Sequence, residues 1–240
     1  MENTVQKIKT LEWFGITEAM HAHGYAVVSK LLTDAQCEML KENYDTAALY
    51  RKTVVMARHR FGLGEYKYFN YPLPVLIQTI RTALYPFLAS IANTWFKALK
   101  IDRIFPLDHK ELLTECRLHE QDQATVLILR YGKGGFNTLH QDLYGEVYFP
   151  IQVVLLLSDP ETDYSGGEFV LTQQIPRAQS KAVVLKPKKG DMVIFATNFR
   201  PERGSKGYYR VNMKHGVSTV TSGERHALGI IFHDAIKIVG

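Results

Sequence analysis

The hydrophobic positions at the start of the chain follow the spacing of a helix and then of a strand. Apolar side chains at positions 8, 11 and 16–20 form one stripe that ends near Gly24, which predicts a first helix. The β-branched run at residues 25–28 predicts a short strand. Thr33 and Gln36 have the spacing of a capping box, so we expect a second helix to begin at residue 34.

A longer helical pattern follows in the middle of the chain. Between residues 75 and 99, apolar side chains recur every three or four positions, which predicts one long helix with a kink at Pro86. We therefore expect residues 1–123 to be rich in helices that support the rest of the fold.

After residue 123 the period changes to that of strands, and Gly, Pro, Asn, Asp and Ser separate the apolar runs. The predicted strands are residues 124–131, 149–157, 168–171, 182–185, 192–197, 208–220 and 227–232. Many short strands at this spacing are typical of an antiparallel sandwich or barrel. The fold class is therefore predicted as α+β, with a jelly-roll core at about residues 124–235.

The composition is that of one folded domain. The chain has 240 residues, of which 46% are hydrophobic and 22% charged, and a single core can grow to about 250 residues before chains tend to split. We expect residues 1–240 to form a single domain. This composition excludes a disordered chain.

The cysteines and the first residues bear on the compartment. Cys37 and Cys116 stand far apart with no neighbouring thiol, which excludes a cysteine-based zinc site and a disulfide framework. Residues 1–20 lack the apolar centre of a signal peptide, and we expect no run of the chain to approach a membrane span. We expect a cytoplasmic protein without a membrane partner, and the sequence predicts no oligomeric state.

The net charge of +5 is modest but unevenly placed. Residues 176–225 hold eleven Lys and Arg against three Asp and Glu, and residues 51–67 form a second basic stretch. Such surfaces attract polyanions, nucleic acid among them. The alternative interpretation is a solvated basic face.

The most informative motif is the pair His140 and Asp142. Residues two apart on an extended chain point to the same side, so both side chains can hold one metal ion. His215 lies in the predicted strand 208–220. We read residues 221–224 as a hairpin turn, which would return Arg225 beside the strand of His215.

Two histidines and one carboxylate leave adjacent positions open on a metal, an arrangement that suits non-haem Fe(II). At this point the sequence resembles the Fe(II)/2-oxoglutarate-dependent oxygenases, whose pattern is His-x-Asp, a distant His, and a cation about ten residues further on. The resemblance implies a double-stranded β-helix, a jelly-roll fold. It implies Fe(II) held by His140, Asp142 and His215, with 2-oxoglutarate as cosubstrate and dioxygen as oxidant. Arg225 is the candidate for the distal carboxylate, because a guanidinium stays charged and binds carboxylates with two donors.

The segment before the metal pair resembles the AlkB-type nucleic-acid demethylases. Tyr131 stands nine residues before His140, at the position where those enzymes have a tyrosine that contacts 2-oxoglutarate. The resemblance therefore assigns a cosubstrate contact to Tyr131. Two features depart from it: Leu129 stands where those enzymes have Asn, and the spacing to Arg225 is more like that of prolyl-hydroxylase relatives.

The substrate is the least constrained part of the prediction. The favoured substrate is a base or nucleotide in nucleic acid, which the enzyme would hydroxylate or oxidatively demethylate. The alternatives are hydroxylation of a protein side chain or small molecule, and a non-catalytic metal-binding β-barrel that acts as a sensor. Interleaved cations and aromatics can clamp phosphates and stack bases, although surface packing explains them equally well. The candidate substrate contacts are Arg58, Arg60, Tyr66, Tyr68 and Arg130.

Overall fold

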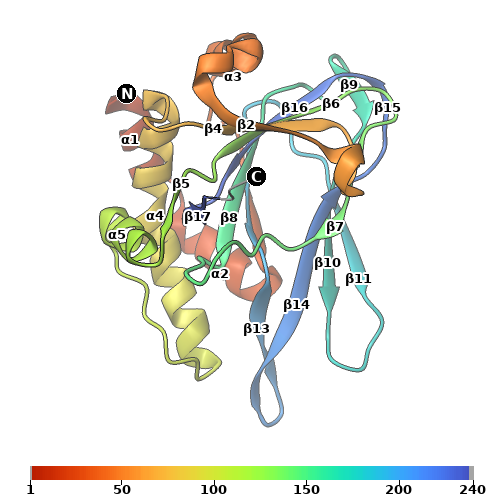
Figure 1. Ribbon diagram of the computed structural model, residues 1–240. Helices are drawn as coiled ribbons and strands as arrows, with labels where there is room; N and C mark the ends of the chain where they lie inside the picture. The colour runs from red at the N-terminus through yellow and green to blue at the C-terminus, as the bar shows by residue number, and fades with distance from the viewer. Residues whose placement is uncertain (1, 238–240) are drawn as a thin grey trace.

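The computed structural model describes residues 2–237, and two antiparallel sheets form its centre (Figure 1). The larger sheet has the order β1 (Tyr25–Val28), β12 (Met192–Ala196), β8 (Ile151–Leu156), β16 (Arg225–Ile230), β6 (Leu127–Tyr131), β4 (Glu65–Phe69), β2 (Tyr50–Val55). The smaller sheet has the order β11 (Lys181–Leu185), β10 (Phe169–Gln174), β14 (Gly207–Val217), β7 (Phe136–His140), β3 (Gly62–Leu63), with β13 (Phe199–Gly204) also paired to β14. The predicted mixture of helices and antiparallel strands is confirmed.

The helices lie against the larger sheet on the side away from the smaller one (Figure 1). They are α1 (Glu2–Lys9), α2 (Trp13–His23), α3 (Asp34–Glu42), α4 (Val75–Ala98) and α5 (His109–Leu118). The shorter elements are β5 (Gln121–Gln123), which pairs with β17 (Ala235–Ile236), and the 3-10 helices η1 (Asn43–Asp45), η2 (Ala47–Leu49) and η3 (Met56–His59). The predicted capping box is present. The Thr33 hydroxyl accepts a hydrogen bond from the Gln36 backbone N–H, and the Gln36 side-chain carbonyl accepts one from the Thr33 backbone N–H.

The main core lies between α4 and the larger sheet. Leu84 and Leu88 of α4 belong to the same buried apolar cluster as Ile128 and Ile194 of the sheet. Helix α4 runs through Pro86 without interruption, so the long predicted helix is confirmed.

Helix α4 is also long and apolar enough to cross a membrane, by length and composition alone. The expectation that no run approaches a membrane span is therefore wrong for residues 75–98. Half of its most apolar window is buried inside the protein, which is the position of a core helix in a folded domain.

The first half of the chain holds more strands than predicted. The single helical stripe at residues 8–20 is two helices, because α1 ends at Lys9 and α2 begins at Trp13. The basic stretch 51–67 forms most of β2 and β4, which extend the larger sheet. Its pattern did not read as a strand because Lys52 and Thr53 are both exposed on the edge strand β2.

The predicted hairpin at residues 221–224 is wrong. Residues 220–223 form a strand of their own, β15 (Val220–Gly223), which pairs with β9 (Tyr164–Gly166). The chain then crosses to the larger sheet, where β16 pairs with β6 and β8. Arg225 therefore lies across the space between the sheets from His215 rather than beside its strand.

The inner faces of the two sheets enclose a second apolar cluster. Phe169 and Leu171 of the smaller sheet pack there against Val154 and Phe195 of the larger sheet. A cavity of about 260 Å³ lies next to this cluster. It is where the predicted metal ligands are found.

Candidate active site

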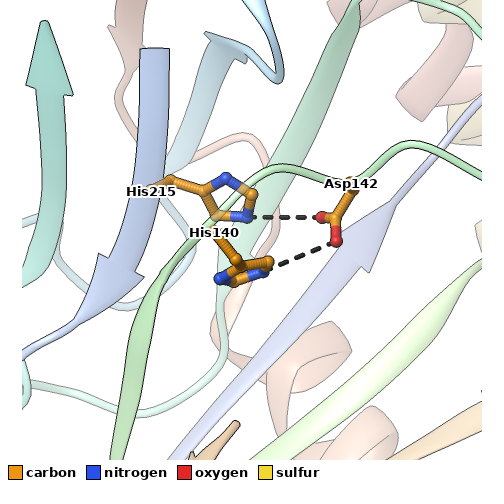
Figure 2. A group of neighbouring side chains, drawn as sticks. All are labelled: His140, Asp142 and His215. Atoms are coloured by element: carbon orange, nitrogen blue, oxygen red, sulfur yellow. Dashed lines mark ion pairs between the residues drawn. The ribbon is translucent and has the colours of Figure 1, made fainter. Parts of the chain in front are cut away.

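His140 and His215 come from neighbouring strands of the smaller sheet. His140 ends β7 and pairs in register with His215 of β14, and their ring centroids are 4.2 Å apart. Asp142 follows two residues after His140, where its backbone N–H donates to Thr197 Oγ1 at 3.2 Å. The strand pairing and this anchor bring the three side chains to one point (Figure 2).

The three side chains form one compact donor set. Asp142 Oδ1 is 3.5 Å from His140 Nε2, and Asp142 Oδ2 is 3.3 Å from His215 Nε2 (Figure 2). The three candidate ligand atoms all lie within 4.8 Å of one another. Asp142 and His215 are buried, and His140 is partly exposed.

Burial, hydrogen bonds and neighbouring charges set the protonation of the three groups. His140 Nδ1 lies 2.8 Å from the carbonyl of Thr138, so Nδ1 carries a proton and Nε2, which faces Asp142, is the nitrogen that can bind a metal. Burial acts to lower the pKa of His140, but the hydrogen bond and charge of Asp142 outweigh it and raise this pKa, so a metal ion has to displace a proton from His140. Burial, followed by the charge of His140, lowers the pKa of His215. Burial acts to raise the pKa of the Asp142 carboxyl, but the hydrogen bonds and charges of both histidines outweigh it and hold this pKa well below its usual range.

These donors fit a divalent first-row metal ion. Two imidazoles and one carboxylate on one side of an ion are the facial set of non-haem Fe(II) enzymes, which leaves positions open for other ligands. Among residues 2–237, no other group of three or more His, Cys, Asp or Glu side chains is placed to hold a metal.

Arg225 and Tyr131 line the same cavity from the larger sheet. They are a register pair of β16 and β6, and the Arg225 guanidinium carbon lies 5.7 Å from the Tyr131 ring centroid. Both side chains are almost completely buried, and neither Arg225 Nε nor the Tyr131 hydroxyl has a hydrogen-bond partner among the described residues. No carboxylate of residues 2–237 lies within 4 Å of the guanidinium. The cavity therefore contains a buried cation without an anion.

Comparison with known proteins identifies the family. The sequence profile of the Oxygenase-NA family, described as oxygenases catalysing oxidative methylation of damaged DNA, matches residues 64–235. The chain belongs to this family. An uncharacterized protein of Mycobacterium tuberculosis, found in strains CDC 1551 / Oshkosh and H37Rv, is 43% identical to the oxygenase over 193 residues, which are 78% of this chain and 83% of the relative.

Solved structures share the fold of the oxygenase. A 2-oxoglutarate-Fe(II) oxygenase family oxidoreductase of Burkholderia pseudomallei superposes with a TM-score of 0.57 at 15% identity, covering 95% of this chain and 94% of that chain. A Trichoplax adhaerens prolyl hydroxylase, solved with a hypoxia inducible factor peptide, superposes with a TM-score of 0.54 at 15% identity. The match covers 95% of this chain and 91% of that chain. A Pseudomonas putida prolyl-4-hydroxylase superposes with a TM-score of 0.52 at 12% identity, and the match covers 93% of this chain and 98% of that chain. The family confirms the predicted oxygenase class, and the fold is that of solved 2-oxoglutarate-Fe(II) oxygenase family proteins.

Two glycines allow the oxygenase to pack Arg225 and Tyr131 closely. A Cβ on Gly167, whose φ is +60°, would stand 3.0 Å from Arg225 Cδ. A Cβ on Gly64, whose φ is +147°, would stand 2.7 Å from Tyr131 Cδ1. Both distances are shorter than ordinary contacts and both φ angles favour glycine, so these positions need glycine.

Three of the predicted substrate residues lie at or near the cavity. Tyr66 of β4 is part of its wall. Arg58 and Arg60 are exposed and stand between Met56 and Phe61, which both line the cavity.

The other two candidates, Arg130 and Tyr68, are not among the residues that line the cavity. Arg130 lies between the cavity-lining Leu129 and Tyr131 and so points to the opposite face of β6, where its guanidinium stacks 4.3 Å above the ring of Tyr44. Tyr68 is only 9% exposed, and its hydroxyl lies 3.4 Å from that of Tyr144. Tyr68 shares the face of β4 that bears Tyr66, and the two rings are 5.4 Å apart, so its contact with substrate stays a prediction.

Two polar residues of the site, Tyr144 and Gln152, were not predicted from the sequence. The Tyr144 hydroxyl donates to Asp142 Oδ1 at 2.8 Å, and Gln152 Nε2 donates to Asp142 Oδ2 at 2.9 Å. A signal for Gln152 was present, because it is the one polar side chain in the strand Ile151–Leu156. The sequence gives no comparable signal for Tyr144.

Proposed function

We propose that the oxygenase acts on a damaged base in nucleic acid, with Fe(II) held by His140, Asp142 and His215 and 2-oxoglutarate held by Arg225 and Tyr131. With these cofactors and dioxygen bound, the site supplies oxidation of a substrate C–H bond while 2-oxoglutarate becomes succinate and carbon dioxide. We also infer that the two sheets form a double-stranded β-helix, because the ligand strands and the Arg225 strand belong to opposite sheets.

The observation that carries the cosubstrate assignment is the unpaired guanidinium of Arg225. A buried charge is costly unless it is paired, and this one faces a cavity that also contains the metal ligands. A dicarboxylate that binds the metal with one end and Arg225 with the other would neutralise it. The Tyr131 hydroxyl would donate a further hydrogen bond to the same carboxylate.

The cavity entrance supports the nucleic-acid substrate. Phe61 is 46% exposed and lines the cavity, so it stands at the rim. Arg58 and Arg60 precede it, and neither forms an ion pair with any described residue. Thr138 donates from both its N–H and its hydroxyl to the carbonyl of Phe61, which ties this segment to the strand of His140. Free cations beside an exposed ring can bind phosphates and stack a base.

The description of the family as acting on damaged DNA also supports this substrate. If the oxidised carbon is a methyl group on a base nitrogen, the hydroxymethyl product loses formaldehyde and the base is restored. If the carbon belongs to the base itself, the hydroxylated base is the product. Formaldehyde release therefore separates demethylation from hydroxylation.

The test is turnover of methylated oligonucleotides. The protein is incubated with Fe(II), 2-oxoglutarate and single- or double-stranded DNA that carries N-methylated bases, and succinate and formaldehyde are quantified. We expect succinate above the level seen with unmodified DNA. No substrate-dependent succinate and no binding to DNA or RNA at low salt would reject the nucleic-acid proposal. Hydroxylation of a protein side chain or small molecule would then be the leading account.

A further inference from the structure

The carboxylate of Asp142 is held by two side chains that are not among the three ligands. Tyr144 donates to Oδ1 and Gln152 donates to Oδ2. The amide nitrogen of Gln152 also lies 3.1 Å from His215 Nε2. Gln152 is thus within hydrogen-bond distance of two of the three candidate metal ligands.

The amide of Gln152 lies in apolar surroundings, and one half of it has no partner there. The residue is 5% exposed, and its β8 neighbours Ile151 and Val153 are buried and apolar. Its carbonyl oxygen Oε1 is buried without a hydrogen-bond partner among the described residues. A buried carbonyl that makes no hydrogen bond costs free energy, so the contacts that account for a glutamine here are those of its amide nitrogen with Asp142 and His215.

We propose that Gln152 is a positioning residue for Asp142, which holds Oδ2 with its amide N–H and so fixes the plane of the carboxylate toward the two imidazoles. This inference rests on the proposed metal site of His140, Asp142 and His215, and it does not depend on the substrate. Gln152 comes from the larger sheet, whereas both histidines come from the smaller one. Its hydrogen bond therefore also couples the metal ligands to the sheet that bears Arg225.

The physical reason lies in the freedom of a carboxylate to rotate. Asp142 stands beyond the end of β7, so no strand pairing fixes its side chain. Without a donor on Oδ2, the carboxylate can turn about its terminal bond and present its oxygens to the metal in several orientations. Loss of hydrogen-bond partners around metal ligands typically costs 10- to 100-fold in metal affinity.

The experiment compares Gln152→Met with Gln173→Met in the 240-residue chain. Methionine keeps the length of the side chain and removes both the amide N–H groups and the carbonyl. Gln173 of β10 is the control, because its amide donates to the carbonyl of His23 and the residue does not line the cavity. Mn(II) binding is measured by calorimetry without 2-oxoglutarate. The visible absorption of bound Co(II) reports the coordination geometry.

We expect Gln152→Met to weaken Mn(II) binding by about 10- to 100-fold and to change the Co(II) spectrum. Its thermal midpoint without metal is measured to establish that the variant folds, because the substitution removes both an unpaired carbonyl and a hydrogen bond to the buried Asp142 carboxylate. Gln173→Met should keep the wild-type Co(II) spectrum and Mn(II) affinity to within about threefold. If Gln152→Met does not fold, Gln152→Leu is measured in the same way.

Wild-type Mn(II) affinity and Co(II) spectrum in the folded Gln152 variant would overturn the proposal. Equal losses in both variants would also overturn it, because they would indicate general damage to this part of the protein. Failure of the wild type itself to bind Mn(II) would instead refute the underlying metal site, so the two failures are distinguishable.

Discussion

Arg225 and Tyr131 are direct register partners on β16 and β6, and both side chains are buried in the cavity wall opposite the metal ligands. The guanidinium Nε and the tyrosine hydroxyl have no hydrogen-bond partners among residues 2–237. Both groups can therefore donate hydrogen bonds to an anionic ligand that enters the cavity.

Arg225→Ala should weaken 2-oxoglutarate binding while metal binding is retained. Leaving a buried charge without its partner costs about 3 to 5 kcal/mol, which corresponds to about two to three powers of ten in affinity. Calorimetric titration of 2-oxoglutarate into the Mn(II)-loaded protein measures the change. Unchanged affinity would move the role of the cation to another residue, and Arg210 is the next candidate.

Gly167→Ala should also weaken 2-oxoglutarate binding, through displacement of Arg225. The added methyl group would stand 3.0 Å from Arg225 Cδ and 2.9 Å from Val220 Cγ2, at a residue with φ +60°. Strain of this kind costs about 1 to 3 kcal/mol. Gly132→Ala is the control, because a Cβ there meets no atom within 4 Å. Equal effects of both variants on the 2-oxoglutarate dissociation constant would contradict this explanation.

Nucleic-acid binding should depend on salt and on the cations at the cavity rim. Each phosphate contact with a single strand adds about 0.7 to the slope of log affinity against log salt concentration. Arg58→Ala and Arg60→Ala should therefore each lower this slope by about that amount, measured by fluorescence anisotropy with a labelled oligonucleotide. Arg130→Ala is the control, because Arg130 lies on the outer face of β6. A slope that changes only in the Arg130 variant would place the nucleic acid elsewhere.

We expect two buried histidines to lower the free energy of unfolding as the pH falls. Burial, followed by the charge of Arg81, lowers the pKa of His109 and of His233 to about 3. The ordinary value in the unfolded chain is about 6.5, so the unfolded state binds more protons at intermediate pH. The stabilisation is complete above about pH 6.5 and is lost as the pH falls toward 3. Each histidine contributes a slope of about 1.4 kcal/mol per pH unit within this window.

The variant His109→Gln tests this effect, because it removes one of the two titrating groups. Urea unfolding between pH 4 and 6 should show a dependence on pH that is smaller than that of the wild type by about 1.4 kcal/mol per unit. An unchanged slope would mean that the pKa of His109 is the same in the folded and unfolded chain, which would contradict the effect of its burial.

The sequence predicted the parts of the site that depend on local spacing. His140 and Asp142 share one side because they are two residues apart on extended chain, and their convergence with His215 followed from a family pattern. The order of strands was not predictable in this way. Arg225 was expected beside His215, yet it reaches the cavity from the opposite sheet, since strand pairing depends on contacts that are distant in sequence.

The strands of residues 50–69 were missed for a related reason. Lys52 and Thr53 are exposed side by side on β2, so the apolar alternation that marks a half-buried strand is weak there. Without β4 in the prediction, the face that Tyr66 and Tyr68 share could not be assigned. Arg130 lies one position from two cavity residues, Leu129 and Tyr131, which on a strand places it on the opposite face.

The most direct test of the central claim is the conversion of 2-oxoglutarate to succinate by the wild type and by Asp142→Ala. Both proteins are incubated with Fe(II), dioxygen and a methylated oligonucleotide, and metal content is measured in parallel. The account predicts succinate formation by the wild type that requires Fe(II), and loss of both turnover and iron in the Asp142 variant. His140→Ala and His215→Ala should behave in the same way. Normal succinate formation by all three variants would contradict the assignment of these residues as the metal site.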